Sequence, residues 1–271
     1  MPTATDARGC TLSLDTSPTR IVSLVPSQTE LLAHLGLDDQ VVGLTRFCER
    51  PEHWRTNKTI VGGTKQVDLD TVRALNPDLI LANHEENTAD DVAALDDIAP
   101  VFVTEVKTVS GALDMIRTVG ALTGTSDRTS TLVGRIISRF RALPDFPSLR
   151  AVYFIWREPY MTVGRDTFIH DVMQWGGFHN LYAGRTRYPD VSLEALSEQE
   201  PDVLLCATEP FPFHDADRFT DDLRAAVPKT PLEIVDGQPF SWYGPRLLET
   251  PSYLRTLRKT LRARPSTPRP A

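Results

Sequence analysis

The hydrophobic and polar positions of this chain follow one scheme in both halves. Short apolar runs, typical of buried strands, alternate with segments whose apolar residues recur at helical spacing. The predicted strands are 20–25, 41–44, 79–82 and 101–103 in the first half, and 150–155, 203–206 and 232–235 in the second. Predicted helices include 27–35, 69–75, 167–175 and 193–197, and Ser27 and Glu30 have the spacing of a capping box. Alternating strands and helices predict an α/β fold with parallel sheets.

One stretch of this pattern occurs twice. Residues 67–82 (VDLDTVRALNPDLILA) align without a gap with residues 191–206 (VSLEALSEQEPDVLLC). The acid at Asp70 recurs as Glu194, and each copy reads as a short helix, then Pro-Asp, then an apolar strand. A pattern repeated at half the chain length predicts two similarly built lobes. Clefts between lobes commonly bind small ligands, so we expect a ligand cleft between them.

A single helix is predicted between the two halves. In residues 126–143 (SDRTSTLVGRIISRFRAL) the apolar residues fall on one helical stripe, and Pro144 ends the segment. The predicted organisation is an N-terminal tail or short strand at 1–19, an α/β lobe at 20–125, the linking helix at 126–143, a second α/β lobe at 144–261, and a disordered tail at 262–271.

The composition narrows the classes of partner. The formal net charge is −7, which argues against nucleic acid or an anionic membrane surface as the main partner. No apolar run approaches the roughly 18 residues that a membrane helix needs. The N-terminus, MPTATDARGCTLSLD, has neither the basic nor the apolar region of a signal peptide. From the residues alone, the protein is either cytoplasmic or has an export signal missing from this chain.

The loops after the predicted strands carry the candidate ligand-binding residues. Loops at the carboxyl ends of parallel strands form the binding crevice of such sheets. Three of the four Trp residues lie in these loops, which suits a large, flat, partly apolar ligand, although local loop packing explains individual aromatics equally well. Charged neighbours would meet the polar periphery of the ligand. The candidates are Phe47, Glu85, Glu86, Trp156, Arg157, Tyr188, Glu209, Trp242 and Tyr243.

Support for a metal site or for catalysis is weaker. Cys48, His84 and His170 offer mixed metal ligands, but no pair has the spacing of HExxH or CxxC. Glu85 and Glu86 are equally well explained as a solvated face. The chain has no GxSxG elbow, no Walker A loop and no GxGxxG after its first strand, so we predict no catalytic residues, no metal and no cofactor.

Three segments resemble a known family. They are RIVSLVPSQTELLAHLGLDDQVVGLT, VGGTKQVDLDTVRALNPDLILA and MTVGRDTFIHDVMQWGG. They resemble substrate-binding proteins of ABC importers, in the branch with a helical backbone that binds cobalamin, iron chelates and haem, and the chain looks most similar to the cobalamin-binding proteins. The similarity covers about residues 18–258.

That resemblance implies two Rossmann-like α/β lobes joined by one long backbone helix, a bound corrinoid without chemistry, and a location outside the cytoplasm. It also implies that Asp70 and Glu194 dock onto the membrane permease, one carboxylate from each lobe. Two residues depart from the pattern of the cobalamin-binding proteins, which have an aromatic residue at Asn83 and a tyrosine at Phe47.

These departures keep two alternatives open. The ligand is then a ferric chelate, haem or a metal ion, or the chain is a cytoplasmic enzyme or chaperone of tetrapyrrole or metal metabolism on the same fold. In the second case Cys48, His84, Glu85 and His170 are the residues to suspect.

Overall fold

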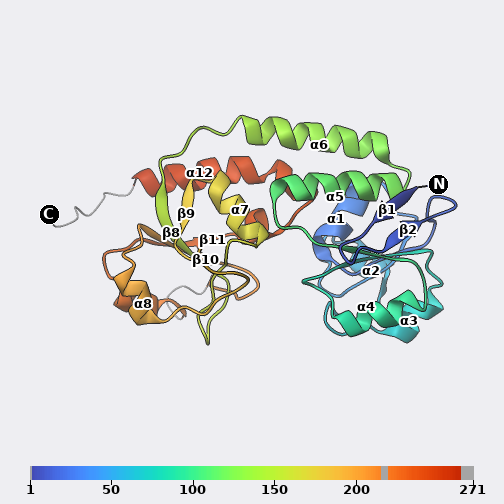
Figure 1. Cartoon of the computed structure of the whole chain (residues 1–271), viewed down its shortest axis with the longest axis horizontal. Helices are drawn as coiled ribbons and strands as arrows, with labels where there is room; N and C mark the ends of the chain where they lie inside the picture. The colour runs from blue at the N-terminus through green and yellow to red at the C-terminus, as the bar shows by residue number, and fades with distance from the viewer. Residues whose placement is uncertain (1, 215–218, 264–271) are drawn as a thin grey trace. The chain divides into compact units, whose positions relative to one another are not determined.

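The structure, a computed structural model, describes residues 2–214 and 219–263. The chain divides into two units, each with one parallel sheet covered by helices (Figure 1). Unit 1 consists of Met1–Val106, Ser110–Ile137 and Trp242–Pro245, and unit 2 holds Lys107–Val109, Ser138–Ser241 and the chain from Arg246. The predicted α/β class with parallel sheets is confirmed.

Unit 1 is built on a five-stranded sheet in the order β5-β4-β3-β6-β7. Its strands are β3 (Ile21–Ser23), β4 (Val41–Leu44), β5 (Thr59–Ile60), β6 (Leu79–Asn83) and β7 (Val101–Thr104). Its helices are α1 (Pro26–His34), α2 (Trp54–Asn57), α3 (Leu69–Ala74), α4 (Ala89–Asp96) and most of α5 (Val109–Leu122). Every residue of β3, β6 and β7 is buried, as expected for parallel strands covered on both faces.

The predicted capping box at the start of α1 is wrong. The helix begins at Pro26, Val25 occupies the cap position, and no side chain makes a capping hydrogen bond there. Proline at the first helical position has a preset φ and lacks the N–H that would need a cap. Ser27 therefore lies within the helix.

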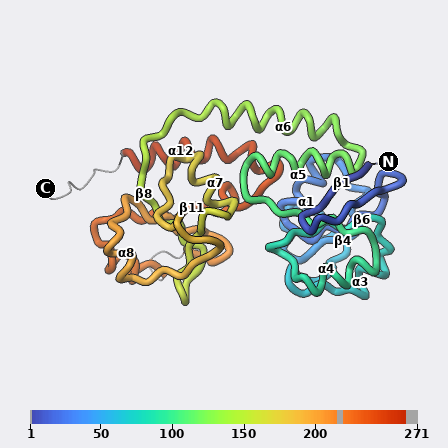
Figure 2. The backbone as a smooth tube through the Cα atoms, in the orientation of Figure 1, coloured from blue at the N-terminus to red at the C-terminus, as the bar shows by residue number. Residues whose placement is uncertain are grey.

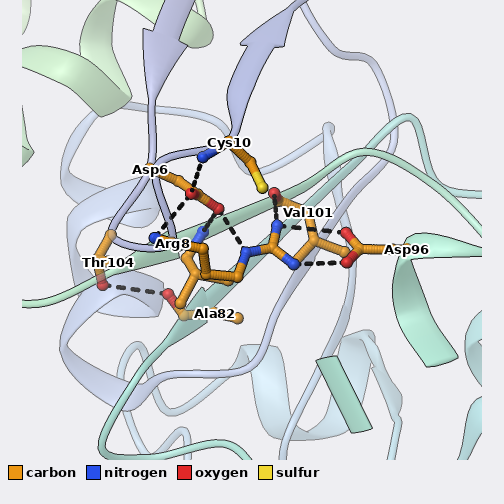
Figure 3. Close-up of polar contacts among 8 residues, drawn as sticks. Asp6, Arg8, Cys10, Ala82, Asp96, Val101 and Thr104 are labelled. Atoms are coloured by element: carbon orange, nitrogen blue, oxygen red, sulfur yellow. Dashed lines mark hydrogen bonds and ion pairs between the residues drawn. The ribbon is translucent and has the colours of Figure 1, made fainter. Parts of the chain in front are cut away.

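A short hairpin precedes the sheet, where a tail or short strand was predicted. Strands β1 (Thr3–Thr5) and β2 (Thr11–Ser13) pair antiparallel. In the turn between them the Asp6 carboxylate accepts hydrogen bonds from Arg8 and from the backbone of Cys10, and Arg8 also pairs with Asp96 of α4 (Figure 3). The Ala7 N–H donates to the Val103 carbonyl, so the turn pairs with the edge strand of the unit 1 sheet.

Unit 2 has a four-stranded sheet in the order β11-β10-β8-β9. Its strands are β8 (Leu149–Phe154), β9 (Phe178–Asn180), β10 (Val203–Ala207) and β11 (Leu232–Val235). The helices are α7 (Phe168–Trp175), α8 (Leu193–Glu198), α10 (Asp221–Ala226), α11 (Gln238–Ser241), the 3-10 turn η1 (Pro245–Leu248), which begins in unit 1, and α12 (Thr250–Ala263).

Two layers of helices cover the unit 2 sheet. One core packs Val152 and Leu204 of the sheet against Leu196 of α8 and Leu223 of α10. On the other face Tyr153 packs against Phe240 of α11, which in turn meets Tyr253 of α12. Helices α8 and α10 therefore lie on one side of this sheet, and α11 and α12 on the other.

The linking helix is present as α6 (Ser126–Arg141) and contains the boundary between the units (Figure 2). It ends two residues before the predicted 143, and its apolar stripe, including Leu132, Ile136 and Phe140, is buried. Helix α12 includes two residues assigned above to the tail, and the rest of that predicted tail, 264–271, lies outside the described residues. Within residues 2–214 and 219–263, no helix combines the length and apolar character needed to cross a membrane.

The sequence repeat is also a structural repeat. Each copy forms a capped helix (α3 or α8) followed by a central strand (β6 or β10). The Asp78 carboxylate accepts the backbone N–H of Arg20, and the Asp202 carboxylate accepts that of Arg150, each at 2.8 Å. The Arg20 guanidinium donates to the Leu75 carbonyl at the end of α3, and the Arg150 guanidinium donates to the Gln199 carbonyl at the end of α8. The Pro-Asp pair thus fixes the neighbouring strand in both units.

Candidate functional site

The predicted ligand-contacting residues lie in loops after the carboxyl ends of parallel strands, in both units. In unit 1 they follow β4 and β6, and a further segment returns from the C-terminal part of the chain. In unit 2 they follow β8, β9 and β10. The two sets differ in chemistry, so each is described separately.

Unit 2 presents an aromatic shelf, which we define as Trp156, Phe211, Phe213 and Phe219. The Trp156 ring stands edge-on to Phe211 with ring centroids 5.7 Å apart. Phe211 also contacts Phe213 at 4.7 Å and Phe219 at 5.0 Å. Trp156 is 42% exposed, Phe211 and Phe219 are partly buried and Phe213 is fully buried, so packed rings support one large exposed indole. Such an indole is suited to stacking on a flat ligand.

Arg157 lies beside the shelf and is held in place on several sides. Its guanidinium carbon is 5.9 Å from the ring centroids of both Tyr160 and Phe219. Its Nε donates to the Tyr160 hydroxyl at 3.3 Å, and the two other nitrogens pair with Glu158 and Asp222. These partners, the Tyr160 hydrogen bond first, raise the pKa of Arg157 above its ordinary value. The cation is preorganised next to the exposed indole.

Backbone contacts connect the loop that carries Trp156 with the loop that carries Tyr188. Met161 bridges to both Trp156 and Asp190, and the Thr162 N–H donates to the Pro189 carbonyl. The Arg187 guanidinium lies 5.4 Å from the Tyr188 ring centroid. The structure therefore brings the loop after β8 and the loop after β9 together. A cation is again held against an aromatic ring.

Glu209 is turned towards the loop after β11. Its Oε1 accepts a hydrogen bond from the Ser241 hydroxyl at 2.9 Å. A Cβ at Gly237 would lie only 2.5 Å from the Glu209 side chain, so that glycine permits the close approach. Glu209 holds α11 in place, and its part in ligand contact stays a prediction.

Phe47 is the most exposed large hydrophobic residue of unit 1, at 50%. The Arg46 guanidinium lies 5.2 Å from its ring centroid. A Cβ on Gly63 would lie 2.9 Å from Arg46 and 3.2 Å from Phe47, so glycine leaves room for the pair. Unit 1 therefore also exposes one aromatic ring with a cation beside it.

Asn83 organises the loop that carries Glu85 and Glu86. It is buried, and its Oδ1 accepts the backbone N–H groups of Glu85 at 2.9 Å and Glu86 at 3.3 Å. Lys65 donates to the carbonyl of Glu85, and Asn87 accepts the N–H of Asn83. The residue that departs from the cobalamin-binding pattern thus has a structural role here. It aims two half-buried carboxylates from one tight turn.

Trp242 and Tyr243 belong to the segment that returns to unit 1, and both are buried. Tyr243 shares hydrogen bonds with Ser27 and Gln28 of α1. Burial, with smaller contributions from Glu86 and Glu85, raises the pKa of its hydroxyl above the ordinary value. Tyr243 therefore lies near the paired glutamates as a neutral phenol.

The alternative metal ligands gain no support. Cys48 is buried, its thiol contacts the Thr29 and Thr45 hydroxyls, and burial raises its pKa. His84 is exposed, whereas the Nδ1 of buried His170 lies 3.1 Å from the amide nitrogen of Asn180. The part of the chain that the structure describes holds no group of three or more His, Cys, Asp or Glu placed to bind a metal.

The two carboxylates of the repeat lie on exposed first turns. The Asp70 side chain is 96% exposed and pairs with Arg73 at 3.0 Å. Glu194 is exposed in the first turn of α8. Helix dipoles favour acids at both positions, which accounts for them without a partner. Their exposure also leaves them available for docking.

Sequence reasoning missed the residues that support the named ones. Phe213, Phe219 and Tyr160 carry the shelf and Arg157, and Asn83 builds the acidic turn. One signal was present: the adjacent pairs Arg46-Phe47, Trp156-Arg157 and Arg187-Tyr188 place a cation next to an aromatic in three of these loops.

Comparisons with known proteins place the chain among its relatives. The chain is 31% identical over 244 residues to a cobalamin-binding protein of Halobacterium salinarum, and the match covers 86% of this chain and 63% of that protein. It therefore spans somewhat less than two thirds of the length of the first such relative. It is also 28% identical over 216 residues to an uncharacterised ABC transporter substrate-binding lipoprotein of Bacillus subtilis, covering 75% of this chain and 68% of that one.

Solved structures show the same fold. A periplasmic haem-binding protein from Roseiflexus sp. RS-1 aligns with a TM-score of 0.75 and 20% identity, over 91% of this chain and 98% of that one. The family model described as "Periplasmic binding protein" matches residues 21–232, which include both copies of the repeat and most of the loops above. The chain therefore belongs to the periplasmic binding protein family.

Proposed function

We propose that this protein is the substrate-binding component of an ABC importer that captures a cobalamin-like corrinoid and delivers it to a permease. Membership of the periplasmic binding protein family supports the general role, and the cobalamin-binding relative supports the ligand class. The same membership supports a location outside the cytoplasm.

The aromatic shelf is the observation that carries the proposal. An indole 42% exposed on a base of packed, partly buried rings offers a flat apolar surface of the kind that a corrin macrocycle covers. Arg157, fixed beside it, is suited to a phosphate or amide group at the ligand's edge. In unit 1, Phe47, Glu85 and Glu86 offer a second ring and two acceptors for amide N–H groups.

The role requires no chemistry. The Cys48 thiol has a raised pKa, which disfavours the reactive thiolate, and two hydroxyls surround it. The Nδ1 of His170 is taken up by a structural amide. Two of the residues suspected for an enzyme or chaperone, Cys48 and His170, are therefore engaged in structural contacts within their units, which favours capture and release over turnover.

Two tryptophans make a matched test. Trp156 is 42% exposed and Trp175 is 41% exposed, both in unit 2, and Trp175 lies outside the aromatic shelf. We expect Trp156→Ala to weaken cyanocobalamin binding, measured by calorimetry, and Trp175→Ala to leave it unchanged. Equal affinities for the two variants would remove this site. Titration with haem and with a ferric hydroxamate in parallel distinguishes a wrong ligand from a wrong site. If only the ligand is wrong, Trp156→Ala should weaken the binding of one of these two compounds instead.

A further inference from the structure

A row of cations runs along the outer side of α12. Arg255, Lys259 and Arg262 are exposed and spaced by four and three residues, which places them on one face of the helix. The Arg255 guanidinium donates to the Ala142 carbonyl at 3.3 Å, next to exposed Arg141 at the end of α6. We call these four cations, Arg141, Arg255, Lys259 and Arg262, the basic face.

The basic face carries its charge without compensation. None of its four cations forms an ion pair with any residue that the structure describes. Elsewhere in the same unit Arg157 pairs with Asp222, and Arg246 with Glu249. Helix α12 contains no acid, although the whole chain has a net charge of −7. Interaction with the helix dipole explains a cation only in the last turn, which leaves Arg255 and Lys259 unexplained.

An exposed indole lies against this face. Trp175, at the end of α7, is 41% exposed and meets the Phe140 ring edge-on at 5.2 Å. Trp175, Arg141 and Phe146 line one hollow of about 610 Å³. Two acids, Asp145 and Asp171, also line it, and the Asp171 carboxylate accepts the backbone N–H of Val109. Phe146 in turn lies 5.5 Å from the guanidinium carbon of Arg258 of α12. The hollow and the basic face are therefore parts of one continuous surface.

This surface lies apart from the loops and the docking helix of unit 2. Trp175 is followed directly by β9, so it lies at the amino edge of the sheet, whereas the aromatic shelf follows the carboxyl ends of β8 and β10. Helices α8 and α12 cover opposite faces of that sheet (Figure 1). A partner on the basic face leaves Glu194 of α8 exposed.

We propose that the basic face and Trp175 form a docking surface for an anionic lipid bilayer. The cations meet phosphate headgroups, and each exposed Lys or Arg near an anionic bilayer strengthens partitioning about fivefold. The indole enters the interfacial region, where amphipathic rings are favoured. Charge alone also fits a soluble polyanion, but an exposed indole beside the cations fits the bilayer interface better.

The test is flotation of the whole protein with vesicles. We expect binding to phosphatidylglycerol/phosphatidylcholine vesicles at low salt, loss of binding in 0.5 M salt, and no binding to phosphatidylcholine alone. The variant Arg255→Gln, Lys259→Gln, Arg262→Gln should bind at least about tenfold more weakly. The control Arg55→Gln, Arg117→Gln, Lys229→Gln removes the same charge from exposed cations elsewhere and should bind like the parent. Thermal unfolding of all variants establishes that they are folded.

Trp175→Ala distinguishes a bilayer from a polyanion. We expect it to weaken vesicle binding severalfold while leaving all the cations in place. The tryptophan fluorescence of the parent should shift to the blue on vesicles, and that of Trp175→Ala should not. Equal loss in the two triple variants would overturn the proposal. The proposal would also be overturned if the protein bound polyphosphate as tightly as it binds the vesicles and Trp175→Ala left that affinity unchanged. The basic face would then be assigned to soluble polyanions.

Discussion

The two units share their structural repeat and differ in their ligand loops. In both, a capped helix and a Pro-Asp pair precede the strand, and even the left-handed residue recurs, at Asn76 with φ 45° and Glu200 with φ 44°. At the carboxyl ends of the strands the likeness is lost. Among its described loops unit 1 has one exposed ring, Phe47, and, after another strand, the half-buried Glu85 and Glu86, whereas unit 2 has a shelf of packed rings.

The difference separates two kinds of constraint. The repeat is fixed by backbone geometry, because a strand start must be hydrogen-bonded in either unit. The loops after the strands do not share this requirement, and their side chains differ between the two units. The loops of unit 2 are therefore suited mainly to apolar contact with a ligand, and those of unit 1 mainly to polar contact.

The largest expected effect is on ligand affinity, and it compares the exposed rings of the two units. Trp156→Ala should weaken corrinoid binding at least about tenfold, since buried aromatic anchors commonly contribute more than 1.4 kcal/mol. Phe47→Ala should cost clearly less, because Phe47 lacks a base of packed rings. Calorimetric titration of both variants measures this. A larger loss from Phe47→Ala would transfer the main apolar contact to unit 1.

The shared scaffold predicts matched losses of stability. Asp78→Ala and Asp202→Ala each remove a carboxylate that accepts a strand-start N–H, and each should lower the free energy of unfolding by about 1–2 kcal/mol. Urea unfolding measures the change. The control is Asp127→Ala, an exposed acid in the first turn of α6, which should change stability little. If only one of the two variants loses stability, the structural repeat does not have the same role in both units.

A buried histidine gives unit 2 a pH dependence. The Asn180 Oδ1 accepts the Tyr182 N–H, which turns the Asn180 amide nitrogen towards Nδ1 of His170 and requires that nitrogen to accept. Burial lowers the pKa of His170 below 6.5. Below about pH 6.5 the unfolded chain therefore binds more protons, so stability is full above that pH and falls as the pH decreases through the lowered pKa.

His170→Gln should flatten the fall in stability between pH 7 and 5, as followed by urea unfolding at each pH. His34 of unit 1 is exposed, so His34→Gln is the control that removes a histidine outside a buried site. It should leave the fall in stability that His170 causes in place. An unchanged slope in His170→Gln would show that this histidine has the same pKa in the folded and unfolded chains, so that burial does not lower it.

The smallest effect concerns docking. Asp70→Ala and Glu194→Ala should leave ligand affinity unchanged, and each should weaken association with the permease at most about fivefold, as exposed ion pairs do. Association with permease in detergent or nanodiscs, measured at low and high salt, follows the effect. Identical association of the double variant and the parent at low salt would assign both acids to helix stability alone.

The sequence predicted the parts of the molecule that depend on local pattern. The bounds of β4 and β11 match the prediction, and α6 was located to within two residues, because apolar period and breakers decide such elements. The capping box failed because Pro26 starts α1 one residue earlier. The support of Trp156 by Phe211 depends on a tertiary contact that no spacing along the chain encodes. The acceptor role of Asn83 is a local turn contact with the next residues, which the sequence permitted but the prediction missed.

The most direct test of the account is calorimetric titration of the purified protein with cyanocobalamin, with hydroxocobalamin, haem and a ferric hydroxamate in parallel. The account predicts saturable one-to-one binding of a corrinoid at micromolar affinity or tighter, lost or strongly weakened in Trp156→Ala. Absence of heat with both corrinoids, with saturable binding of haem or the ferric chelate, would contradict the corrinoid assignment.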